Sequence, residues 1–135
     1  MNMPSEDIKD MLTEDGSLSE LQFGENLFIG AEPSTPDNCV TIFDSVGRGP
    51  MLTLDKQVNY EYPSIQVRVR NNSYPDGWAQ INDVVASLHG RAGETWEGAV
   101  YDVIRCTASP AFMAWDDNGR AIFVVNFDLQ RKEVI

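Results

Sequence analysis

Histidine and cysteine are almost absent from this chain of 135 residues, which holds only His89, Cys39 and Cys106. The two cysteines are 67 positions apart, and no CxxC or Cys/His spacing typical of a zinc site occurs. A cysteine nucleophile would need the histidine beside it, yet His89 ends a predicted helix and Cys106 lies in a predicted strand. We therefore expect no metal site, no required disulfide and two structural cysteines.

Long apolar runs are also missing. No stretch approaches the ~20 residues that a membrane-spanning helix needs. The start, MNMPSEDIKDML, carries acidic residues where a secretory signal would carry lysines. We therefore expect a protein that stays in the cytoplasm of the cell that makes it and has no contact with a membrane.

Positive charge is scarce, because ten Lys and Arg face 21 Asp and Glu and the formal net charge is −11. The excess is concentrated in residues 1–37, which hold nine acidic residues and a single base, Lys9. Proteins that bind nucleic acid normally present a basic face to the phosphates. The composition thus argues against DNA binding and favours a surface that repels DNA or meets a basic partner.

The sequence contains few residue patterns that are typical of catalytic sites. The segment GRGP at residues 47–50 has neither the lysine nor the following helix of a phosphate-binding loop. The adjacent Asp116 and Asp117 precede Asn-Gly, which is ordinary turn chemistry. We expect no enzyme and no cofactor.

The apolar pattern predicts an α+β fold with a mostly antiparallel (mixed) sheet, two helices packed on one face, and a single domain over residues 1–135. The first helix is expected to begin at an N-cap, Ser5, within the acidic segment 1–37, and to end near Asp15-Gly16. A second helix is expected over 74–90, with Trp78 on its apolar stripe. Strands are expected over 40–46, 64–71, 97–109, 111–115 and 120–130, with a loop from Gly47 that includes a possible weak strand at 51–54.

An arginine ladder alternates with apolar residues in the segment SIQVRVRN, residues 64–71. Alternation places Ile65, Val67 and Val69 on the core face, so Gln66, Arg68 and Arg70 share the outer face. The outer face could simply be solvated, which discourages aggregation. Alternatively, the arginines could pair with carboxylates of a neighbouring copy, since arginine suits bidentate pairing at interfaces. The candidate partners are Asp116, Asp117 and the acidic N-terminal segment, and truncation of an arginine would then weaken assembly and leave the monomer's melting unchanged.

The last predicted strand is apolar on both faces. Ile122 and Val124 lie opposite the core-facing residues, where a solvated face would be polar. Either a subunit contact or a long loop could cover them, and the pattern does not separate the two.

Four segments in order resemble the phage minor capsid and tail-terminator family of long-tailed bacteriophages. They match P-D-x-x-V-x-I-x-D-x-x-G from Pro36, P-x-x-Q-V-x-V-R from Pro63, a helix ending in L-x-G, and D-x-x-G-R-x-x-F-x-x-N-F from Asp116. The resemblance spans nearly the whole chain. The patterned polar positions are Gln66, Arg68, Arg70, Asp116, Gly119, Arg120 and Asn126.

This resemblance implies a structural virion protein. Such proteins form a ring, typically a hexamer, that caps the tail tube, stops its polymerisation and meets the head-tail connector. The protein would then lie in the tail or neck of the virion after assembly in the host cytoplasm. DNA would pass through the ring without specific binding. The alternative is a neck or head-completion protein of the same particle, and an unrelated small enzyme or binding domain is disfavoured. Together these considerations predict an interface made by Gln66, Arg68, Arg70, Asp116, Asp117, Arg120, Ile122 and Val124.

Overall fold

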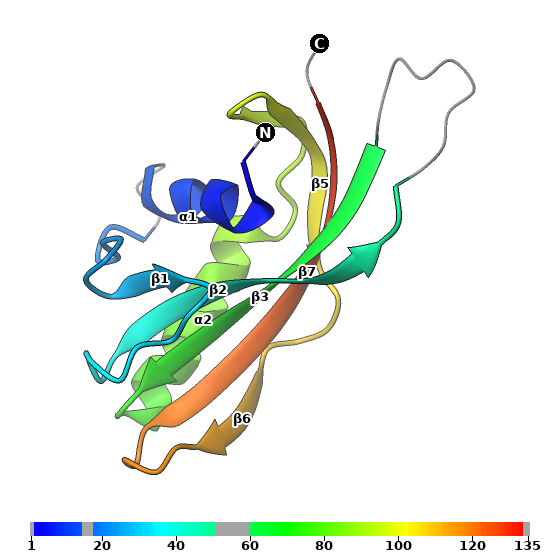
Figure 1. Cartoon of the computed structure of the whole chain (residues 1–135). Helices are drawn as coiled ribbons and strands as arrows, with labels where there is room; N and C mark the ends of the chain where they lie inside the picture. The colour runs from blue at the N-terminus through cyan, green and yellow to red at the C-terminus, as the bar shows by residue number, and fades with distance from the viewer. Residues whose placement is uncertain (1, 15–17, 51–59, 134–135) are drawn as a thin grey trace.

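The computed structural model describes residues 2–14, 18–50 and 60–133, which form two helices and seven strands (Figure 1). The helices are α1 (Pro4–Glu14) and α2 (Tyr74–Leu88). The strands are β1 (Leu27–Ile29), β2 (Cys39–Arg48), β3 (Tyr60–Asn71), β4 (Glu94–Trp96), β5 (Ala99–Cys106), β6 (Ala111–Trp115) and β7 (Ala121–Glu133). The possible weak strand at 51–54 lies outside the described residues.

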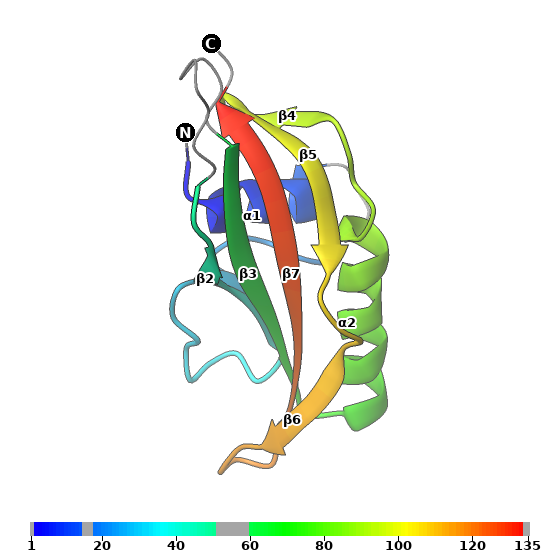
Figure 2. The same ribbon diagram turned by 90° about the vertical axis from the view of Figure 1, so that its right-hand side faces the viewer.

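All seven strands belong to one sheet with the order β1-β2-β3-β7-β5-β4, and β6 pairs with β7 beside this path. β1 runs parallel to β2, and the other pairs are antiparallel. β6 follows β5 along the same side of β7, so one long strand serves two shorter neighbours (Figure 2). The predicted α+β fold with a mixed, mostly antiparallel sheet is confirmed.

The core lies between the sheet and the two helices, which pack on the same face of the sheet (Figure 2). Alternation directs Val67 and Val69 of β3 inward, and neither side chain is exposed to solvent. Phe123 and Phe127 of β7 are equally buried beside them. We call this the inner face of the sheet and the opposite side its outer face.

Helix α2 forms where the apolar spacing predicts it. The hydroxyl of Ser73 caps its first turn by accepting a hydrogen bond from the backbone N–H of Asp76 at 3.4 Å. The stripe formed by Ile81, Val84 and Leu88 is fully buried, in agreement with the prediction. Trp78 does not belong to the core, because 45% of its surface is exposed.

Helix α1 begins differently from the prediction. Ser5 is not its N-cap but lies inside the helix, where its Oγ donates to Oδ2 of Asp44 at 2.6 Å. The backbone N–H of Ser5 donates to the other oxygen of the same carboxylate at 3.0 Å. The carboxylate of Asp44 in β2 therefore accepts hydrogen bonds from the first turn of α1. A negative charge at this place is also stabilised by the positive end of the helix dipole.

A buried carboxylate also fastens α1 to the sheet. Asp7 is fully buried, accepts a hydrogen bond from the hydroxyl of Tyr101, and lies 3.7 Å from Nη1 of Arg131. Burial raises the pKa of the Asp7 carboxyl, and the Tyr101 hydrogen bond and the charge of Arg131 act in the opposite direction.

Several strands depart from their predicted limits. β2 and β3 extend further than expected toward residues 49–59, and β7 continues to Glu133. β1 was not predicted as a strand, because three residues are too few to show an alternation. The turn from Asp116 to Gly119 forms as predicted, with the N–H of Gly119 donating to the carbonyl of Asp116 at 3.2 Å.

Candidate assembly surfaces

Arg70 of the predicted ladder is enclosed by its own chain, with only 4% of its surface exposed. Its Nη2 donates to the carbonyl of Pro36 at 2.7 Å, and its Nε donates to the carbonyl of Asp37 at 3.2 Å. The carboxylate of Glu32 lies 3.8 Å from Nη1. The segment before β2 thus folds over the outer face, and its carbonyl and carboxylate groups are the hydrogen-bond and ion-pair partners of this guanidinium.

Arg68 shares the carboxylate that faces Arg70. Its Nη2 lies 3.2 Å from Oε2 of Glu32, and the guanidinium lies 6.0 Å from the ring centre of Phe43 on the adjacent strand. The side chains of Arg68 and Glu32 are 23% and 14% exposed. One carboxylate therefore bridges both ladder arginines within one chain.

Arg120 holds the same segment from the other side. Its Nη1 donates to the carbonyl of Ser34 at 2.7 Å and to Oδ1 of Asp37 at 3.3 Å. Its Nε donates to Oδ2 of Asp116 at 2.7 Å. The backbone N–H of Arg120 lowers the pKa of the Asp116 carboxyl by donating to it, with further donation from the guanidinium and from the N–H of Asn118.

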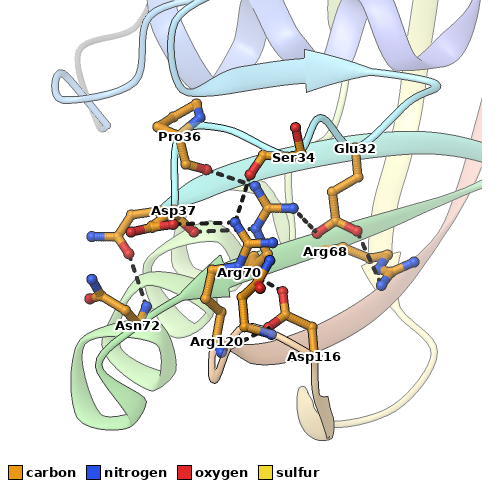
Figure 3. A network of polar contacts seen from close by, with 11 residues as sticks. Glu32, Ser34, Pro36, Asp37, Arg68, Arg70, Asn72, Asp116 and Arg120 are labelled. Carbon is orange, nitrogen blue, oxygen red and sulfur yellow. Dashed lines mark hydrogen bonds and ion pairs between the residues drawn. The ribbon is translucent and has the colours of Figure 1, made fainter.

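Four of the predicted interface residues, Arg68, Arg70, Asp116 and Arg120, thus meet in one network around residues 32–37 (Figure 3). Their partners belong to the same chain. Truncating Arg70 would remove bonds to this segment, so the structure leads us to expect a lower melting temperature of the monomer in place of the unchanged melting that the sequence predicts. Whether any of these side chains also reaches a neighbouring copy stays a prediction.

The other predicted interface residues lie apart from this network. Gln66 is half-buried and donates to the side chain of Asn126 at 3.2 Å, and Asp117 is exposed in the turn before β7. Ile122 is only 7% exposed, whereas Val124 is half-buried. Ile122 is thus largely enclosed within its own chain, and a subunit contact at Val124 stays a prediction.

An aromatic surface escaped the sequence analysis. It consists of Tyr74 and Trp78 on α2 and Phe112 and Trp115 on β6, all of them exposed. The Tyr74 ring centre lies 5.4 Å from that of Phe112 and 6.0 Å from that of Trp115. The signal was present in the segment AFMAW, which is apolar on both faces of a short strand.

His89 and Cys106 come closer than the sequence indicated. The backbone N–H of Cys106 donates to Nδ1 of His89 at 3.0 Å, because the end of β5 lies against the end of α2. Burial raises the pKa of the Cys106 thiol, so the site lacks the features that stabilise a reactive thiolate.

Among residues 2–14, 18–50 and 60–133, no three His, Cys, Asp or Glu side chains are placed to hold a metal ion. None of the helices within these ranges is both long and apolar enough to span a membrane.

Comparison with known protein families supports the resemblance. A family model described as "Bacteriophage tail terminator protein" matches residues 12–133, which is nearly the whole chain. A search among curated proteins found no match. The match covers the sheet, α2 and the network around residues 32–37, and a family match of this extent identifies a structural protein of the phage tail. The chain belongs to the bacteriophage tail terminator family.

Proposed function

We propose that this protein forms a ring, typically a hexamer, on the end of the completed tail tube, stops further polymerisation, and joins the tail to the head. The family match over residues 12–133 carries this proposal. Its partners are then further copies of itself, the tail tube protein and the head-tail connector. The ring resides in the virion after assembly in the host cytoplasm.

The charge of the chain suits a ring through which DNA passes. A net charge of −11 opposes stable contact with phosphates, whereas a basic lumen would retain the DNA during transit. The expected result of a gel-shift experiment is weak binding of duplex DNA that disappears as salt is raised. Tight binding at physiological salt would contradict this part of the proposal.

Of the residues predicted at an interface, those that keep exposed surface are the ones proposed to meet a partner. Asp117 is exposed, and Gln66, Arg68 and Val124 are half-buried. Arg70 and Ile122 support the surface from beneath, since their own chain encloses them.

The test is a phage whose copy of this gene carries an early stop codon. We expect tails of abnormal length that do not join heads, and restoration when the intact chain is supplied in trans. Electron microscopy of negatively stained lysates measures both tail length and attachment. Tails of normal length beside defective, empty heads would favour a neck or head-completion protein instead.

A further inference from the structure

A groove of about 530 Å³ crosses the outer face of the sheet beside the C-terminal half of β7. Its walls come from β2 and β5, and its floor comes from β3 and β7, which lie between them (Figure 2). Three strand spacings separate the walls, which therefore stand roughly 14 Å apart. A volume of this size falls within the range of ligand pockets, about 300–1,000 Å³.

Both walls of the groove contain a β-bulge. The register of β2 against β3 shifts after Ser45, and that of β5 against β7 shifts after Tyr101. Gly47 is required at the first bulge, because a Cβ there would collide with the carbonyl oxygen of Tyr62. Bulges change the direction of nearby side chains and are frequent next to functional sites.

After its bulge, each wall presents a valine followed two positions later by an arginine. These pairs are Val46 with Arg48 in β2 and Val103 with Arg105 in β5. Val46 is 97% exposed and Val103 is 37% exposed. The groove therefore offers an apolar group and a positive charge on both sides.

The two guanidinium groups keep hydrogen-bond donors that the described residues do not use. The guanidinium of Arg48 lies 4.1 Å from the ring centre of Tyr62 and has no carboxylate partner among those residues. The side chain of Arg105 is 67% exposed, and its pair with Oδ2 of Asp128 is long, at 3.9 Å. The other oxygen of Asp128 accepts a hydrogen bond from Ser64 at 2.6 Å. Two arginines and one carboxylate leave the groove positive on a chain whose net charge is −11.

We propose that this groove binds an extended acidic segment of another protein of the tail. One carboxylate of the segment pairs with Arg48 and a second with Arg105, while apolar side chains between them contact Val46 and Val103. Arginine suits this ligand, because its planar fork binds a carboxylate through two hydrogen bonds and can stack on an aromatic ring at the same time. The inference goes beyond the ring proposed above, since it names a different contact and does not depend on a ring.

A second copy of this chain is a poorer occupant of the groove. Four of the nine acidic residues at positions 1–37 lie in helix α1, and two more, Glu32 and Asp37, pair with arginines of the network around residues 32–37. A helix or a fixed loop does not present carboxylates along an extended segment. Two copies with a net charge of −11 also repel each other, which favours a different chain.

Peptide binding to the purified full chain tests the chemistry of the groove. The probe is the blocked peptide SEVEVES with a fluorescent label, and SQVQVQS and SKVKVKS are its matched controls. Fluorescence anisotropy is expected to show at least tenfold tighter binding of SEVEVES than of either control, and this binding should weaken as salt is raised. Equal binding of the three peptides, or no binding of SEVEVES, would overturn the inference.

Single substitutions locate the site. Arg48→Ala and Arg105→Ala are each expected to weaken binding of SEVEVES about tenfold and to keep the wild-type melting temperature, because both side chains are exposed. Lys9→Ala is the matched control, since it removes one positive charge from α1, where Lys9 pairs with Asp10 at 2.8 Å. This variant is expected to bind SEVEVES as the wild type does. An equal loss in Lys9→Ala would show a general effect of charge and would overturn the groove as the site.

Photo-cross-linking in assembled tails identifies the source of the segment. Val46→Cys, in a chain that also carries Cys106→Ser, is labelled with a benzophenone maleimide, while the native Cys39 is only 2% exposed. Mass spectrometry is expected to find a cross-link to a segment of a different tail protein that carries at least two acidic residues. A cross-link to a second copy, or to a segment without acidic residues, would overturn the inference.

The peptide measurements decide the inference where the labelled chain does not enter tails. They also separate it from the proposed function, because they use the purified chain. A wild-type chain that binds SEVEVES but forms no ring on tails would refute the ring alone. A chain that forms the ring but does not bind SEVEVES would refute the groove alone.

Discussion

Replacement of Arg70 by alanine is expected to loosen the fold of the single chain. The substitution removes two hydrogen bonds, of 2.7 and 3.2 Å, to the carbonyls of Pro36 and Asp37, and it removes the cation closest to one oxygen of Glu32. A hydrogen bond to a charged group contributes about 1.5–3 kcal/mol, and a broken buried ion pair costs about 3–5 kcal/mol. Pro36 and Asp37 are exposed, so water partly replaces the lost donors. We therefore expect a loss of about 2–3 kcal/mol in the free energy of unfolding.

The assay is urea unfolding of the purified monomer followed by tryptophan fluorescence, with a thermal melt in parallel. For a chain of this length the expected loss corresponds to a decrease in Tm of about 7–11 °C. Arg68→Ala is expected to cost about 0.5–1 kcal/mol, because its pair with Glu32 is more exposed. Arg70→Lys is expected to recover less than half of the loss, since a single ammonium cannot donate as the planar guanidinium does.

Gln66→Ala is the matched control on the same strand and face. Its hydrogen bond to Asn126 lies in an exposed position, so the loss should stay near 0.5 kcal/mol. If Arg70→Ala cost less than about 1 kcal/mol, the bonds to residues 36 and 37 would contribute little, and the ladder would be free to serve an interface.

Three further substitutions test other parts of the molecule. Gly77→Ala would place a Cβ 2.6 Å from Cε2 of Phe123, so it should lower the free energy of unfolding by about 1–3 kcal/mol in urea titrations, and a gain would refute the close packing. Asp44→Ala removes the acceptor at the start of α1 and should cost about 0.5–2 kcal/mol, with faster hydrogen exchange in that helix as the measurement. Because burial raises the pKa of Asp7, the folded chain holds this proton more firmly than the unfolded chain, and wild-type stability relative to Asp7→Asn should fall as pH rises through the raised pKa. Urea unfolding over a pH series checks this, and a rise over the same interval would contradict it.

The sequence predicted best those elements in which apolar residues recur at one regular spacing along the chain. Ile81, Val84 and Leu88 recur at helical spacing, and α2 buries all three. The start of α1 was misplaced because the partner of Ser5 is Asp44, 39 residues away, and a tertiary contact of this kind overrides a local capping pattern. β1 has only three residues and pairs in parallel, so it leaves no periodic signal.

The arginine ladder was placed on the correct face, but its intramolecular partners had no recognisable sequence signal. Alternation along β3 directs Arg68 and Arg70 outward, as the structure confirms. Two of the acceptors of Arg70 are backbone carbonyls. Every residue type carries the same backbone carbonyl group, so the identity of a residue does not mark it as an acceptor. No residue pattern could therefore show that residues 36 and 37 would fold over this strand.

The polar network and the aromatic surface differ in how they are satisfied within the chain. Residues 32–37 form no helix or strand, so the side chains of Arg70 and Arg120 supply the hydrogen bonds that regular structure would otherwise provide. These same arginines offset acidic groups within the chain, at Glu32, Asp37 and Asp116. The aromatic surface carries no charge of its own and needs no such compensation. A partner that packs against this surface therefore buries no unpaired carboxylate of the surface itself.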